Sequence, residues 1–164
     1  MRQFIRSFWA YLTNSESEDV RDFQLKFKQL VNHVPVHLTR RKLNERAECM
    51  QEELDEFKAA IQTQDLAEQA DALIDLVYFA KGTANMLGLP WNQLWDDVQR
   101  ANMSKVAGVG KRGHLVDCIK PPGWRGPMTG LILSQAGYDP TQFQCPATST
   151  ILEENCHDDA IHLM

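Results

Sequence analysis

The sequence predicts an all-α protein, a helical bundle followed by an irregular C-terminal tail. Between Thr39 and Leu87 there is no proline and only one glycine, Gly82, so two long helices joined by one turn fit this stretch. Apolar residues recur there at spacings of three and four, the period of an amphipathic helix. Seven of the nine glycines and five of the seven prolines lie beyond Ser104. We therefore expect loops after that residue.

Composition indicates one globular domain. The 164 residues are 43% hydrophobic and carry a formal net charge of −5, which allows a substantial core and argues against non-specific nucleic-acid binding. The four cysteines show neither Cys-x-x-Cys nor zinc-finger spacing, which suits free thiols in a reducing compartment. We expect a cytoplasmic protein, in the host cytoplasm if the source is a virus, with neither a membrane nor a nucleic acid as partner.

The chain is expected to begin with an amphipathic extension over residues 1–16. Two arginines interrupt its apolar side chains, so the run is too short and too broken for a signal peptide or a membrane span. Ser15 and Glu18 have the spacing of a capping box, so a helix should begin near Ser17. The stripe that this helix would turn inward is Val20, Phe23, Phe27, Leu30 and Val31.

Local signals mark the ends of the later helices. Thr39 can cap the first long helix, and a polar turn near residues 62–64 separates it from the second. Gly88 suits the C-terminal cap of the second helix, and Pro90 suits the first turn of a helix that reaches Met103. The sequence thus predicts a long helical hairpin followed by a shorter helix.

Two rows of carboxylates distinguish the long helices. The rows are Glu52, Glu53 and Glu56 on the first helix and Glu68, Asp71 and Asp75 on the second. Steps of three and four place each row on one helix face, and like charges there destabilise a helix by roughly 0.2–0.5 kcal/mol per pair. Neither row has a lysine or arginine three or four positions away. If the helices are antiparallel, the rows face each other across a gap that cations would make tolerable.

Each row lies beside an apolar stripe, which we expect to form the seam between the two helices. The stripes are Leu43, Ala47, Met50, Leu54, Phe57 and Ile61 on the first helix, and Leu66, Ala70, Leu73, Val77 and Ala80 on the second. A single acidic helix face is usually only solvated. Two facing rows beside a seam instead indicate an oxygen-only site, which suits Mg²⁺ or Mn²⁺ rather than Zn²⁺.

These residues carry a resemblance to a known superfamily. Glu-Glu-x-x-Glu at 52–56, followed by Glu-x-x-Asp at 68–71, resembles the MazG-type all-α nucleoside triphosphate pyrophosphohydrolases, which include dimeric dUTPases and phosphoribosyl-ATP pyrophosphohydrolases. Asn-Met-Ser-Lys at 102–105 and Lys-Pro-Pro-Gly-Trp at 120–124 are similar to the end of the core in several of these proteins. We therefore assign the domain to residues 17–127 and leave 128–164 as the irregular tail.

The resemblance implies hydrolysis of a (deoxy)nucleoside triphosphate to the monophosphate and pyrophosphate. It implies a four-helix core completed in a homodimer or homotetramer, with the site near a subunit boundary. The roles implied are Mg²⁺ or Mn²⁺ ligation by Glu53, Glu56, Glu68 and Asp71 with further support from Asp75, orientation or deprotonation of water by Glu52, and nucleotide or phosphate contact by Asn102, Lys105, Lys111, Arg112 and Lys120.

Substrate choice remains open at this stage. A purine nucleotide such as dGTP or GTP, of the kind that some phage enzymes hydrolyse, is the first expectation, and dUTP or dUDP is the alternative. The histidine-pathway substrate is less favoured, because the chain after Lys105 does not resemble that branch. A non-catalytic helical domain with an acidic face is the rival from another class. A di-iron bundle is disfavoured, since no histidine lies between His37 and His114.

Overall fold

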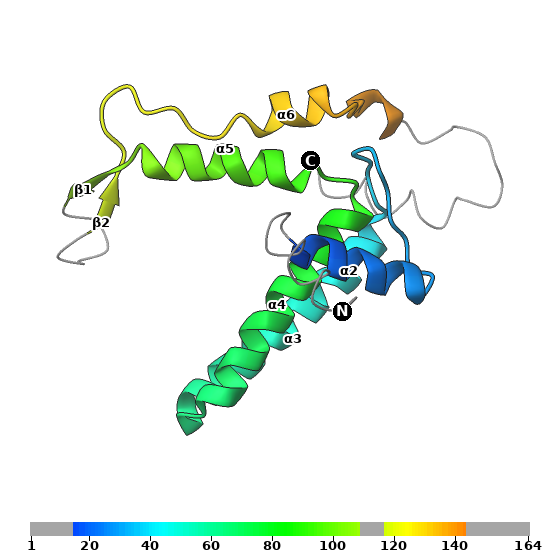
Figure 1. Cartoon of the computed structure of the whole chain (residues 1–164), viewed down its shortest axis with the longest axis vertical. Coiled ribbons are helices and arrows are strands. Elements are labelled where there is room, and N and C mark those ends of the chain that lie inside the picture. The colour runs from blue at the N-terminus through cyan, green and yellow to red at the C-terminus, as the bar shows by residue number, and fades with distance from the viewer. Residues whose placement is uncertain (1–14, 109–116, 144–164) are drawn as a thin grey trace, which may run out of the picture.

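A helical hairpin forms the long axis of the molecule in the computed structural model, which describes residues 15–108 and 117–143 (Figure 1). The expected all-α class is confirmed. The helices are α2 (Ser15–Lys26), α3 (Arg40–Thr63), α4 (Leu66–Met86), α5 (Trp91–Met103) and α6 (Thr129–Gln135), with the 3₁₀ helix η1 (Pro140–Phe143) and two strands, β1 (Val106–Gly108) and β2 (Asp117–Ile119). The extension at 1–14, Lys111, Arg112 and the tail at 144–164 lie outside the described residues.

Local caps define the hairpin formed by α3 and α4. The Thr39 side chain accepts a hydrogen bond from the Lys42 backbone N–H at 3.3 Å, as predicted for the start of α3. Gln64, with φ of 57°, ends α3 in the left-handed conformation. Asp65 then accepts from the N–H groups of Ala67 and Glu68, which satisfies donors in the first turn of α4. The two helices are therefore joined by a connection of only two residues.

Helix α2 crosses the upper part of the hairpin at Gly82. Gln24, which is 2% exposed, donates from its side chain to the Gly82 carbonyl at 2.9 Å. A Cβ at Gly82 would lie 3.5 Å from atoms of Val20 and Gln24 and 3.3 Å from the end of the Arg46 side chain, so the two helices are in direct contact here. The helix ends at Lys26, earlier than expected, because Lys28 adopts a left-handed conformation with φ of 55°. Of the predicted inward stripe, Val20 is buried, whereas Phe23, Phe27 and Leu30 are exposed.

Lys81 links three helices at the point where α5 begins. Its side chain is 7% exposed and forms a 2.8 Å ion pair with Glu16 of α2. Its Nζ also lies 5.5 Å from the centroid of the Trp91 ring, at the start of α5. Gly88, with φ of +65°, turns the chain between α4 and α5 as predicted, while Pro90 is the N-cap rather than a first-turn residue. From here α5 diverges from the hairpin (Figure 1).

The segments after α5 fold back along it, and we call α5, β1, β2 and α6 together the arm. Residues 106–127 were expected to form a loop and residue 128 onward an irregular tail, but the structure contains a two-stranded antiparallel ribbon and helix α6 there. Hydrogen bonds to α5 hold the segment between the ribbon and α6 in place. The Trp124 indole donates to the Ala101 carbonyl at 2.9 Å, Arg100 donates to the Gly126 carbonyl at 3.1 Å, and Asp97 accepts from the Met128 N–H.

The apolar stripes of the hairpin form only part of the seam that we expected, because Met50, Phe57 and Ala80 are half-buried while the other large residues of the stripes are exposed. Leu66, Leu73 and Val77 of α4 are 77%, 45% and 48% exposed, whereas Ala60 of α3 and Ala72 of α4 are only 5% and 3% exposed. Small residues at these positions let the helices approach closely. A single chain therefore leaves much of its apolar surface uncovered, which is unusual for a monomer.

None of the helices in the described part of the chain combines the length and the apolar character required to cross a membrane.

Gly88 gives a test of the connection between α4 and α5. A Cβ at this residue would collide with the Val34 carbonyl, and the positive φ disfavours any side chain. We expect Gly88→Ala to lower the free energy of unfolding by about 1–3 kcal/mol or more. Gly123 is the matched control, since it has φ of +77° but nothing within 4 Å of the position that a Cβ would take. Denaturant unfolding that shows equal losses for Gly88→Ala and Gly123→Ala would contradict the proposed collision.

Candidate active site

Glu53 lies in the seam between α3 and α4, where one of its oxygens is cut off from water. Its Oε2 atom is buried and has no hydrogen-bond partner. Burial raises the pKa of the Glu53 carboxyl, and the charges of Glu56, Asp75, Glu52 and Asp71 raise it further, in that order. We call these five carboxylates the acidic cluster. Carboxylates from both helices therefore act on Glu53, as the prediction of two facing acidic rows requires.

Glu68 occupies a different position from the other predicted ligands. It lies in the first turn of α4, where its backbone N–H is capped by Asp65 and where the helix dipole favours an acid. It is not among the charges that raise the pKa of Glu53, whereas Asp75 contributes more than Asp71. The charge of Asp75, expected to have a supporting role, thus acts more strongly on Glu53 than that of Asp71.

The cations near the cluster are engaged elsewhere. Arg46 lies two helical turns before Glu53, but it donates to the Thr83 hydroxyl at 3.0 Å and to the Phe79 carbonyl at 3.1 Å. Lys58 forms the expected exposed pair with Asp55 at 2.8 Å. No cation is among the groups that shift the pKa of Glu53. The negative charge in the seam is therefore uncompensated by these side chains.

The donors of the acidic cluster fit a hard divalent cation. All are carboxylate oxygens, the ligand type that Mg²⁺ and Mn²⁺ prefer, and the unpartnered Glu53 Oε2 lacks the positive charge that such an ion would supply. Within residues 15–108 and 117–143, no three acidic, histidine or cysteine side chains are close enough to form a complete metal-binding group. Binding of one ion by three of these groups would therefore require their side chains to converge.

Aromatic side chains adjoin the acidic cluster. Tyr78 lies three residues after Asp75, and its pKa is raised by burial and by the charges of Asp19 and Asp75. The Phe23 ring meets Tyr78 edge-on with centroids 5.5 Å apart, and Phe27 lies 4.6 Å from Phe23. Phe23 and Phe27 are 41% and 55% exposed. The sequence indicated helical core positions for both phenylalanines, and only the packing of α2 on α4 reveals this aromatic platform.

Three residues predicted to contact the nucleotide come together at the end of α5. Lys105 donates to the Asn102 side-chain oxygen at 2.8 Å. The ribbon register pairs Val106 with Ile119, so Lys105 and Lys120 flank the same end of the ribbon. Lys120 Nζ lies 4.5 Å from the centroid of the Trp124 ring. We call Asn102, Lys105 and Lys120 the basic group.

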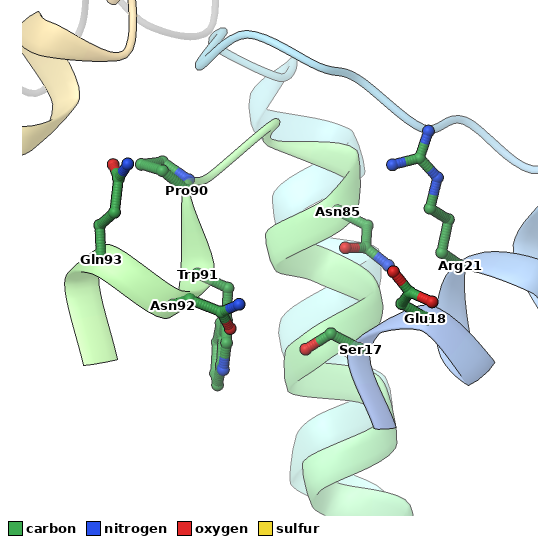
Figure 2. A pocket seen from close by; sticks show the side chains of 8 residues that line it. All are labelled: Ser17, Glu18, Arg21, Asn85, Pro90, Trp91, Asn92 and Gln93. Atoms are coloured by element: carbon green, nitrogen blue, oxygen red, sulfur yellow. The ribbon is translucent and has the colours of Figure 1, made fainter. Parts of the chain in front are cut away.

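A polar cavity of about 290 Å³ lies between α2, the end of α4 and the start of α5 (Figure 2). Ser17, Arg21, Asn85 and Trp91 are among the side chains that line it, and the Ser17 hydroxyl is buried without a hydrogen-bond partner. The close packing of α2 at Gly82 lies between Asn85 and the acidic residues of α4. This cavity is therefore separate from the acidic cluster.

The raised pKa of Glu53 predicts how stability depends on pH without metal. The folded protein holds this proton more tightly than the unfolded chain, so stability is lost as pH rises from the ordinary carboxyl pKa through the raised value. We expect Glu53→Gln to remove this loss and to raise the melting temperature in EDTA at neutral pH. Asp55→Asn is the control, because the pKa of Asp55 is lowered by its hydrogen bond to Lys58. A lower melting temperature for Glu53→Gln than for Asp55→Asn would refute this account.

Comparison with known proteins places the helical core in a family. The family model for phosphoribosyl-ATP pyrophosphohydrolase matches residues 20–102, which include most of α2, the whole hairpin and nearly all of α5. All five members of the acidic cluster lie within the match. No curated protein gives a significant match to the chain. The chain therefore belongs to the phosphoribosyl-ATP pyrophosphohydrolase family and is a MazG-like all-α pyrophosphohydrolase for a nucleotide-like substrate.

Proposed function

We propose that the protein hydrolyses a (deoxy)nucleoside triphosphate to the monophosphate and pyrophosphate at the acidic cluster, with Mg²⁺ or Mn²⁺. The observation that carries this proposal is the buried, unpartnered Oε2 of Glu53 among four further carboxylates. A fold stabilised only by packing gains nothing from such an arrangement, because uncompensated buried charge costs free energy. The family match supports pyrophosphohydrolase chemistry at the same residues.

The residues of the acidic cluster are proposed to have two roles, binding of the ion and activation of the attacking water. Glu53 and Glu56 of α3 and Asp71 and Asp75 of α4 would hold the divalent ion, with Glu68 a further candidate ligand one turn before Asp71. The ion, when bound, supplies positive charge that neutralises phosphate oxygens. Glu53 at the centre needs that charge most, since burial contributes most to its raised pKa.

Glu52 is our candidate for orienting the attacking water and accepting its proton. It is exposed, it precedes Glu53 directly, and its charge acts on Glu53. A carboxylate at the rim of the cluster can accept a hydrogen bond from water while the other carboxylates hold the ion. The water oxygen would then attack phosphorus, and pyrophosphate would leave with the electrons of the broken P–O bond.

The nucleoside is proposed to rest on the aromatic platform of Phe23, Phe27 and Tyr78. Stacking of a base on an aromatic side chain contributes about 1–3 kcal/mol, and every base offers a face for it. Purines present the larger face, which agrees with dGTP or GTP as the first expectation. Stacking alone does not exclude dUTP or dUDP, which stay as alternatives within the same superfamily.

The family match favours a second candidate substrate, phosphoribosyl-ATP, because this compound is in the name of the matching family. It is itself an adenosine triphosphate derivative, so the same acidic cluster could act on it. A substrate panel separates these possibilities. A non-catalytic acidic domain would release pyrophosphate from none of them.

The test is pyrophosphate release with Mg²⁺ or Mn²⁺ across the common ribo- and deoxynucleoside triphosphates, dUDP and phosphoribosyl-ATP. We expect Glu56→Gln to lower kcat/KM at least about a hundredfold, because loss of one ligand carboxylate removes charge stabilisation of several kcal/mol. Asp55→Asn, which alters an exposed carboxylate on the same helix, should retain activity.

Two results would refute the proposed chemistry. One is near-native turnover by a correctly folded Glu56→Gln protein. The other is the absence of pyrophosphate release from every compound in the panel by the unmodified chain.

The aromatic platform gives a separate expectation for substrate binding. Phe23 is half exposed and packs against Tyr78 beside Asp75. Phe23→Ala should raise KM by roughly 5-fold to 100-fold, the equivalent of a lost stacking contact, with a smaller change in kcat. Leu25→Ala is the control, since Leu25 is an exposed apolar residue on the same helix. An unchanged KM for the purine substrates in Phe23→Ala would remove the platform from the binding site.

A further inference from the structure

We propose that the polar cavity at the start of α5 is a second binding site, which takes the phosphate group of a small phosphorylated compound. The cavity has a volume of about 290 Å³ and lies between α2, the end of α4 and the start of α5. Ligand sites in proteins usually have volumes of about 300–1,000 Å³, so this one suits a small compound. It is separate from the acidic cluster, and the inference therefore does not depend on the proposed function.

Two helices begin at this cavity. Ser17 and Glu18 belong to the first turn of α2, and residues 91–93 form the first turn of α5. No side chain caps α5, whose N-cap residue is Pro90. The first N–H groups of a helix lack acceptors within the helix, and the helix dipole adds partial positive charge there. The backbone around the cavity therefore favours an anion over a cation.

A buried hydroxyl in the cavity wall independently points to a ligand. The side-chain oxygen of Ser17 is buried and has no hydrogen-bond partner among the described residues. Figure 2 shows this oxygen directed away from α2, toward the side of the cavity where α5 begins. A buried hydroxyl without a partner destabilises the fold. Because its hydrogen can rotate to suit an acceptor, a phosphate oxygen in the cavity would supply the missing partner.

Arg21 gives the cavity a positive charge, and Glu18 opposes it. One nitrogen of the Arg21 guanidinium lies 3.2 Å from His33 Nδ1 and 3.3 Å from His33 Nε2. A guanidinium has five N–H donors, so others remain for phosphate oxygens, with which arginine forms strong charge-assisted hydrogen bonds. Glu18 also lines the cavity and is exposed. Removing the charge of Glu18 should therefore strengthen the binding of an anion, whereas it would weaken the binding of a cation.

The remaining walls of the cavity are held in place by contacts with neighbouring side chains. Trp91 stacks on Trp95 with ring centroids 6.2 Å apart, and Lys81 Nζ lies 5.5 Å from the centroid of the Trp91 ring. The Asn85 amide nitrogen donates to the Gln24 side chain at 3.0 Å, which leaves the Asn85 side-chain oxygen for a ligand. A ligand therefore meets a largely preformed surface, and less free energy is lost in ordering side chains when it binds.

The test is titration calorimetry of the whole chain, freed of divalent ions on a chelating resin, with inorganic phosphate, pyrophosphate and dGMP as probes. Without a bound ion, the acidic cluster repels all three anions. We expect saturable binding that Arg21→Gln weakens at least about tenfold, because a charge-assisted hydrogen bond to phosphate is lost. Glu18→Gln should strengthen this binding, and Lys105→Ala should leave it unchanged, since Lys105 belongs to the basic group.

Three results would overturn the proposal. They are the absence of binding by every probe, binding that Lys105→Ala abolishes while Arg21→Gln retains it, and weaker binding after Glu18→Gln. The probes also separate the sources of the phosphate group. Equal affinities for inorganic phosphate and dGMP would support a site that reads the phosphate alone, whereas tighter binding of dGMP would support a site that also contacts the organic part of a monophosphate.

Ser17→Ala separates ligand binding from a structural role of the hydroxyl. It removes one donor to phosphate, so the affinity should fall about fivefold, the equivalent of one neutral hydrogen bond. It removes no hydrogen bond within the described part of the chain, so the melting temperature without phosphate should not fall. A lower melting temperature together with an unchanged affinity would show that the hydroxyl serves the fold, and would overturn its role in this site.

Discussion

The burial of one Glu53 carboxylate oxygen between two helices is the constraint on which the candidate site depends. A carboxylate in that position loses hydration, and the neighbouring acids of both helices add repulsion. Alanines at positions 60 and 72 let the helices pack closely despite this charge. The negative charges in the seam therefore destabilise the fold, and a bound divalent ion would reduce their repulsion. This connects the stability of the fold with the chemistry proposed for the site.

Polar contacts around the seam keep its charge in place. Arg46 lies on the same helix two turns before Glu53, but its bonds to Thr83 and to the Phe79 carbonyl hold it toward the upper part of the hairpin. Gln24 fixes α2 against Gly82, and this packing brings Phe23 beside Tyr78. The same crossing thus separates the polar cavity from the acidic cluster and supplies aromatic surface next to it.

The direction of the arm has a separate cause. Lys81 joins Glu16 to Trp91 at its beginning, and the Tyr138 hydroxyl lies 2.6 Å from His37 Nε2 at its end. Between these ties, Asp97 and Arg100 hold the returning chain on α5. The pKa of Asp97 is lowered first by the Met128 N–H and then by Arg100, as expected for a carboxylate that organises a turn of the chain. The arm is thereby an ordered element able to present the basic group at a defined position.

The sequence by itself predicted the helical hairpin and the helix after it, and it predicted which carboxylates make up the candidate site. The absence of proline, the Thr39 cap and the Gly88 turn predicted the hairpin, and the spacing of acids predicted two facing rows. These features are local, because helix periodicity assigns a residue to a face from its spacing alone. Asn102 and Lys105, in contrast, were identified only by resemblance to a known family. Their spacing alone does not show which groups they would contact.

Tertiary structure decided which faces meet. Helix periodicity does not say how deeply each stripe packs inward. Ala60 and Ala72 are buried while most of the larger predicted residues are exposed, and Asp75 rather than Glu68 acts on Glu53. The register of a two-stranded ribbon placed Lys120 beside Lys105 across 14 intervening residues, a pairing that no local signal encodes. Contacts between distant segments depend on how surfaces fit together and on which backbone groups pair. Both are defined only in the folded chain.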